Sequence, residues 1–145
     1  MYFVDREKIE EMLTFMDHQL KHLQQPFMKV TLLEQAAIER WAHTVIEAIL
    51  DVGNSMIDGF IMRDPGSYED IVDILTDEKV ITEKMSVDLK KVISYRKMLV
   101  QQYTEVDHSK ILTDFQTHME SLSAYSAKVR EYLTNELGPV SAFRN

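Results

Sequence analysis

The sequence contains no cysteine, which excludes disulfide bonds and any zinc site built on thiolates. A chain without thiols suits a reducing compartment. Its first residues, MYFVDREKIEE, are acidic where a secretory signal would be basic and then apolar. No apolar run approaches the length that spans a bilayer. We therefore expect a cytoplasmic protein without a membrane partner.

Basic residues are also in deficit. The 145 residues include 16 Lys and Arg against 24 Asp and Glu, which gives a net charge of -8. Such a surface repels nucleic acid on average, so general binding to phosphate is not expected. A local basic site is compatible with this charge. The densest basic cluster, in LKKVISYRK, comprises Lys90, Lys91, Arg96 and Lys97.

Only four glycines and three prolines interrupt the chain. Apolar residues at spacings of three and four predict long helices, which we place at residues 5–24, 31–61, 82–102 and 108–137. Ser67-Tyr68-Glu69-Asp70 fits a capping box that opens a short helix to about residue 75. No alternating strand pattern occurs. We expect an all-α fold, a four-helix bundle with one extra short helix. It would form a single domain over residues 1–145 that ends in a tail at 138–145.

Polar residues of the second predicted helix share one face. At about 100° per residue they fall within an arc of roughly 140°. A solvated face explains this pattern. Carboxylates and a histidine one turn apart also resemble metal ligands, but di-metal bundles use Glu-x2-His pairs, which this chain lacks. We therefore expect no metal. The residues of the arc are Glu39, Arg40, His43, Glu47, Asp51, Asn54 and Asp58.

Arg96 interrupts an apolar row in the helix predicted at 82–102. The row places this arginine in line with Leu89, Val92 and Leu99, which are expected to face the core. A buried, unpaired guanidinium costs several kcal/mol, so Arg96 should meet carboxylates or open into a wet cleft. We expect a bond from Arg96 to Glu47, to Asp51 or to both. The alternative is a side chain that reaches solvent from a helix end.

Three segments, in this order, resemble the HepT-like proteins of the HEPN superfamily. They are AIERWAHTVIEAILDVGN at 37–54, PGSYEDI at 65–71 and LKKVISYRKMLVQQY at 89–103. The similarity extends to the branch known as YutE-like and covers nearly the whole chain. It implies an all-α homodimer that acts as a metal-independent ribonuclease toxin without a cofactor. The resemblance further implies a minimal nucleotidyltransferase (MNT) antitoxin as partner.

The motif of that family is Arg-x4-His-x-Tyr, and this chain departs from it at one position. Arg96 and Tyr103 match the arginine and the tyrosine, whereas Gln101 stands where the histidine belongs. Attack of a ribose 2′-hydroxyl on phosphate needs proton transfer near neutral pH, which histidine provides and glutamine does not. Losing such help typically removes a factor of roughly 10² to 10⁴. We expect RNA cleavage to be impaired.

The resemblance also suggests roles for single residues. Arg96 and Gln101 would form the catalytic position, and Tyr103 would be the residue that an MNT partner nucleotidylates. Supporting polar residues would be Glu47, Asp51 and Asn54, and candidate RNA contacts would be Lys90, Lys91 and Lys97. His108 follows the motif, but its spacing does not show that it reaches the cleft between two subunits in which the motif residues of the family gather. The alternative function is a non-catalytic dimeric module that binds RNA, a nucleotide or a protein.

Overall fold

The computed structural model of the protein describes residues 2–139. Within this range the chain forms only helices, and no strand is present. The helices are α1 (Arg6–Leu23), α2 (Leu32–Gly59), α3 (Tyr68–Asp77), α4 (Glu83–Ile93), α5 (Arg96–Val100), α6 (His108–Thr117) and α7 (Met119–Leu137). The expected all-α bundle is confirmed, with α3 as the extra short helix. Most of the predicted tail, residues 140–145, lies outside the described range.

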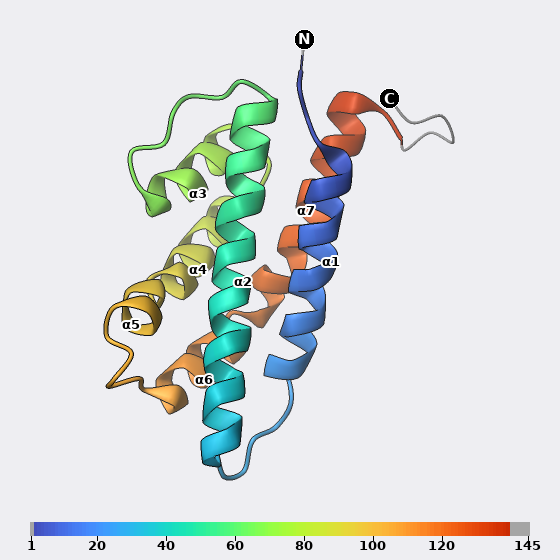
Figure 1. Ribbon diagram of the computed structural model, residues 1–145. Coiled ribbons are helices and arrows are strands. Elements are labelled where there is room, and N and C mark those ends of the chain that lie inside the picture. Colours follow the sequence, from blue (N-terminus) through green and yellow to red (C-terminus); the bar gives the residue numbers. More distant parts are fainter. Residues whose placement is uncertain (1, 140–145) are drawn as a thin grey trace.

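The long helix α2 lies at the centre of the bundle (Figure 1). Helix α1 packs along α2, and α3, α5 and α6 also contact α2 (Figure 1). Helix α7 packs against α1 and α4, and α4 packs against α3. One continuous core joins these layers, and it includes the fully buried side chains of Met16, Ile49, Leu89, Phe115 and Tyr125. Among the described helices, none has the length and hydrophobicity needed to cross a membrane.

Side-chain caps fix most helix starts. Asp5, Thr31, Ser67, Thr82 and Asp107 each accept a hydrogen bond from a backbone N–H in the first turn of the helix that follows. Such a bond satisfies one of the N–H groups that a helix start leaves without a partner. The sequence signals for helix starts were therefore reliable, including the one at Ser67.

Two predicted helices are interrupted. The helix expected over 82–102 breaks at Ser94 and Tyr95, where the Ser94 hydroxyl donates to Lys91 O at 2.6 Å and Tyr95 N donates to Val92 O at 3.1 Å. These bonds to the third residue back tighten the chain and end α4. The Tyr95 ring is buried, and its hydroxyl donates to the carboxylate of Asp114 on α6. The break therefore turns the chain just before the motif arginine.

The helix expected over 108–137 is interrupted at His118, between α6 and α7. The Nδ1 atom of His118 lies 3.1 Å from the Asp88 carboxylate on α4. The break turns α7 back onto α4 and α1, which completes the bundle.

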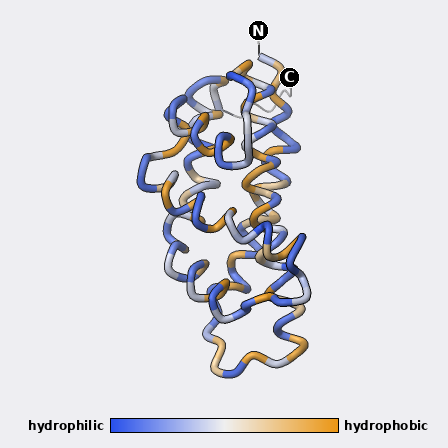
Figure 2. Tube along the Cα trace, turned by 90° about the vertical axis from the view of Figure 1, so that its left-hand side faces the viewer, coloured by the Kyte–Doolittle hydropathy of each residue, from blue (hydrophilic) through white to orange (hydrophobic). Residues whose placement is uncertain are grey.

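An exposed apolar end marks the connector between α1 and α2. Met28 is fully exposed, and Leu32 and Leu33 remain largely exposed at the start of α2. Figure 2 shows orange, hydrophobic segments at the lower end of the molecule, where Figure 1 places the connector between α1 and α2. This end lies apart from the two described chain ends, which are both at the opposite end (Figure 1).

Candidate functional site

Arg96 begins α5, directly after the break in the predicted helix. Its Nε donates to Glu47 Oε1 on α2 at 2.7 Å, which confirms the expected contact with this carboxylate. The Arg96 side chain is 26% exposed, so it lies at the edge of the bundle and not in the core. The prediction of a core position was wrong because the break at Tyr95 places that ring in the interior instead.

A second contact holds the guanidinium from α3. The Arg96 Cζ lies 4.6 Å from the centre of the Tyr68 ring, a cation–π arrangement. Arg96 is thus held by α2 and α3 together, although the three residues are far apart in sequence. Over residues 2–139 the only protein acceptor of the guanidinium is Glu47. The two Nη groups therefore still have donors for a ligand.

Carboxylates shape the electrostatics around Arg96. The hydrogen bond to Glu47 raises the pKa of Arg96, so the guanidinium stays charged. Burial, followed by repulsion from Glu47, raises the pKa of Asp51, while Lys8 and Arg96 act in the opposite direction. Asp51 influences Arg96 through charge alone, because the only hydrogen bond goes to Glu47. The site is one strong cation beside acidic neighbours.

The rest of the motif lies in the turn that follows α5. Gln101 closes that helix through its backbone N–H, which donates to Lys97 O at 2.8 Å, and its side chain is exposed. Tyr103 is 68% exposed. Within residues 2–139, neither Gln101 nor Tyr103 forms a side-chain hydrogen bond or a cation–π contact with Arg96. Asn54 is exposed farther along α2 and forms no hydrogen bond with Arg96.

The basic cluster is partly neutralised by the protein itself. Lys90 forms an ion pair with Asp73, and the Lys91 Nζ lies 3.8 Å from the Asp114 carboxylate. Lys97 is exposed. Its ammonium group is therefore the most accessible of the three lysines for an incoming anion.

Two histidines lie beside carboxylates of the polar arc of α2, His43 from α2 itself and His108 from α6. His43 Nε2 lies 3.6 Å from the Glu47 oxygen that also accepts from Arg96. His108 Nε2 lies 2.7 Å from Glu39 Oε2, one turn before His43 on α2. The sequence placed Glu39, His43 and Glu47 on one face, but it could not show which residues of other helices lie opposite.

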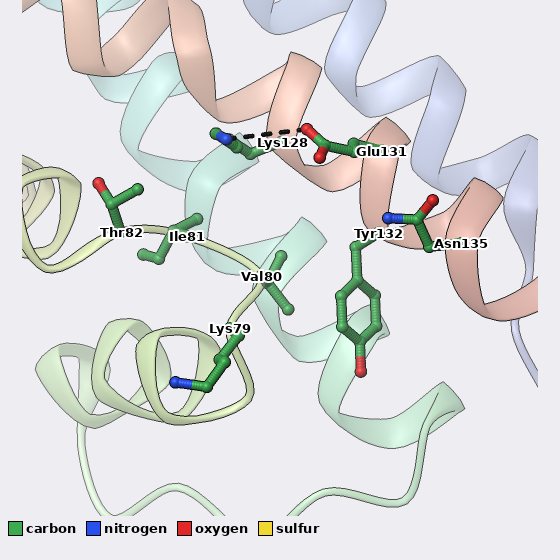
Figure 3. Close-up of a pocket in the computed structure, with 8 residues that line it drawn as sticks. All are labelled: Lys79, Val80, Ile81, Thr82, Lys128, Glu131, Tyr132 and Asn135. Carbon is green, nitrogen blue, oxygen red and sulfur yellow. Dashed lines mark ion pairs between the residues drawn. The ribbon is translucent and has the colours of Figure 1, made fainter.

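Among the hollows at the surface, one includes Glu47, the acceptor of the Arg96 hydrogen bond. This hollow of about 270 Å³ between α1 and α2 is lined by Phe15, Glu47 and Asp51, among others. Another, of about 220 Å³, lies between residues 79–82 and α7, where Lys128 and Glu131 pair at 3.7 Å (Figure 3). None of the predicted site residues lines this second hollow. Over residues 2–139, no group of three His, Asp or Glu residues could hold a metal ion.

The chain is similar to known proteins along its whole length. A family model described as Ribonuclease HepT-like matches residues 6–129. The chain is 52% identical to YutE of Bacillus subtilis (strain 168) over 144 residues. This alignment covers 99% of the chain and 100% of YutE.

Solved structures agree with this relationship. The structure of cytosolic YutE from Bacillus subtilis matches with a TM-score of 0.94 over 99% of this chain and 100% of YutE. A tri-AMPylated HEPN toxin of Shewanella oneidensis, solved in complex with an MNT antitoxin, matches with a TM-score of 0.75. That match is 21% identical over 85% of this chain and 96% of the toxin, so it supports the fold alone. By sequence and by structure, this chain belongs to the Ribonuclease HepT-like family.

Proposed function

We propose that this protein is a ribonuclease toxin component that pairs with an MNT-type nucleotidyltransferase antitoxin. Its RNA cleavage would be weakened by Gln101 at the position of the motif histidine. One observation carries this proposal. The Arg96 guanidinium is fixed by Glu47 and Tyr68, while its Nη groups donate to no acceptor within residues 2–139.

The geometry supports a phosphate-binding role for Arg96. A guanidinium offers paired N–H donors that match two oxygens of a phosphodiester. When a 2′-hydroxyl attacks the adjacent phosphorus, negative charge grows on those oxygens, and a fixed cation stabilises it. Glu47 and Tyr68 hold the cation in place before substrate arrives. A glutamine side chain can donate and accept hydrogen bonds, but it transfers no proton to or from the reacting oxygens.

Tyr103 supports the proposed control by an antitoxin. Its side chain is 68% exposed in the turn after α5, so a nucleotidyltransferase can reach the hydroxyl. A nucleotide attached there would add negative charge and bulk seven residues after Arg96. In this proposal the modified tyrosine blocks RNA, and the active form is a homodimer. Replacing Tyr103 by Phe would then prevent silencing by the partner.

The test is cleavage of a single-stranded RNA by the purified protein and two variants. Arg96→Ala should lower the rate by about 10²-fold or more, since it removes the stabilising cation. Gln101→His should raise the rate, since it returns a proton-transfer group to the motif position. Cleavage that persists undiminished in Arg96→Ala would contradict the proposal.

Gln101 also favours a second candidate function. A site with a phosphate-binding cation but no motif histidine suits a dimeric module that binds RNA without cutting it. RNA binding that depends on Arg96, together with no cleavage by the native protein or by Gln101→His, would favour this binding module.

A further inference from the structure

We propose that His43 supplies the proton-transfer group that position 101 lacks. This inference rests on the proposed ribonuclease function and deepens it by naming the base for cleavage. Sequence alone gave His43 no role beyond membership of the polar arc on α2. The structure places it beside the carboxylate that holds the motif arginine.

One oxygen atom joins the two groups. Glu47 Oε1 lies 2.7 Å from Arg96 Nε and 3.6 Å from His43 Nε2. The guanidinium and the imidazole therefore flank the same carboxylate, one from α5 and one from α2. In the proposal, a phosphate bound at the Nη groups of Arg96 places its neighbouring ribose beside His43. The His43 side chain is 35% exposed, so substrate has access to the ring.

The other four of the five histidines are less suitable. His108 is held by Glu39 at 2.7 Å, and its side chain is only 16% exposed. His118 binds Asp88 at the break between α6 and α7. His22 stacks on Trp41, with ring centres 4.8 Å apart, and His18 is exposed on α1. Of the five, His43 alone lies within ion-pair distance of the carboxylate that binds Arg96.

The proposed step is transesterification within RNA. Neutral His43 takes the proton of the 2′-hydroxyl as that oxygen forms a bond to the adjacent phosphorus. The bond from phosphorus to the 5′-oxygen breaks, and the departing 5′-oxygen takes a proton from water. The products are a 2′,3′-cyclic phosphate and a free 5′-hydroxyl, and His43 later returns its proton to solvent. Arg96 neutralises charge on the phosphate oxygens throughout.

The charged groups around His43 fit this role. Glu47 lies one turn after it and Glu39 one turn before it on α2. Arg96 from α5 binds Glu47, and His108 from α6 binds Glu39. A carboxylate beside an imidazole stabilises the protonated ring that forms during the step. Glu47 thus positions Arg96 and lies beside the ring that takes the proton.

The decisive experiment places His43→Gln in two backgrounds and measures RNA cleavage in each. In the native background the substitution should lower the rate by roughly 10² to 10⁴. In the Gln101→His background the loss should be less than about tenfold, since the motif histidine then transfers the proton. Equal losses in both backgrounds, or no loss in the native one, would overturn the proposal.

Two controls make the outcomes separable. His18→Gln, on the exposed face of α1, should leave the rate unchanged in both backgrounds. His43→Asn should reproduce the effect of His43→Gln with a normal melting temperature, so that a folding defect is not mistaken for lost chemistry. If Arg96→Ala abolishes cleavage but both His43 variants cleave normally, His43 is not the base and the ribonuclease function stands. If neither the native protein nor Gln101→His cleaves RNA, both proposals fail.

Discussion

The Arg96 side chain is restrained by two neighbouring residues, Glu47 and Tyr68. Its Nε donates to Glu47 at 2.7 Å, and its Cζ lies 4.6 Å from the centre of the Tyr68 ring. What remains for a ligand is the outer edge with its Nη donors. The pairing to Glu47 was expected from the sequence, whereas the contribution of Tyr68 required knowledge of how α3 packs.

We expect Arg96 and Glu47 to be coupled energetically. A double-mutant cycle of Arg96→Ala and Glu47→Ala should give a coupling of about 0.5 to 1 kcal/mol, the upper range for a partly exposed ion pair. The same cycle with Asp51→Ala should give a smaller value, because Asp51 acts only through charge. Denaturant unfolding measures both. Coupling that is larger with Asp51 than with Glu47 would contradict the assigned pairing.

Asp88 has a structural role, because it links α4 to Ser121 and His118. It is buried on α4 and accepts bonds from Ser121 and from Lys84, the latter at 3.0 Å, and it lies beside His118. Burial alone would raise the pKa of Asp88. The hydrogen bonds from Ser121 and Lys84 outweigh that effect, so the pKa is lowered.

The lowered pKa predicts how Asp88→Ala depends on pH. In the unfolded chain the carboxyl of Asp88 has an ordinary pKa of about 3.9, and in the folded protein its pKa is lower. Its stabilising contribution is therefore fully present above the unfolded pKa and is lost as the pH falls through the folded pKa. At pH 7 the substitution should cost about 1 to 3 kcal/mol, because Ser121 loses a buried partner. At pH 3 the cost should be smaller than at pH 7, because part of this contribution is lost once the pH is below the unfolded pKa. Urea unfolding at both values tests this, with Asp64→Ala in the exposed α2–α3 connector as control.

At the scale of helices, Gly53 sets how closely α3 packs on α2. A Cβ added there would lie 2.4 Å from Ile71 Cγ2, far inside normal contact. Because Ile71 is buried and β-branched, it has little freedom to move away. Close packing of α3 in turn keeps Tyr68 against Arg96.

Gly53→Ala should therefore destabilise the fold by about 1 to 3 kcal/mol through overpacking. Gly66→Ala is the matched control, since a Cβ there would meet only Asp70 Oδ2 at 3.7 Å. Its effect should stay within about 0.5 kcal/mol. Thermal or denaturant unfolding of both variants checks the difference. A neutral result for Gly53→Ala would show that α3 can shift away from α2.

The sequence predicted the helices well but not the two breaks. Capping residues such as Ser67 and apolar spacing are local signals, and local signals locate helices. The break before Arg96 depends on Tyr95 reaching Asp114, nineteen residues away, which spacing cannot reveal. The pairing of Arg96 with Glu47 was predictable because both lay on faces directed toward each other. The place of His43 at the same carboxylate was not, because it depends on how α5 meets α2.

For the whole molecule, charge and binding must be considered together. The net charge of -8 opposes RNA, and Lys90 and Lys91 are already paired with Asp73 and Asp114. Long-range attraction therefore contributes little to RNA binding. Affinity should depend instead on a few fixed contacts, with Arg96 foremost among them.

The most direct test of the Arg96 site is the binding of a single-stranded oligonucleotide without 2′-hydroxyls, which cannot be cleaved, measured at several salt concentrations. Arg96→Ala should weaken binding by about tenfold or more and should reduce the steepness of the salt dependence by about 0.7, the value for one lost phosphate contact. Lys128→Ala on α7 should change neither quantity. An unchanged affinity and an unchanged salt slope for Arg96→Ala would show that this guanidinium does not bind the phosphate.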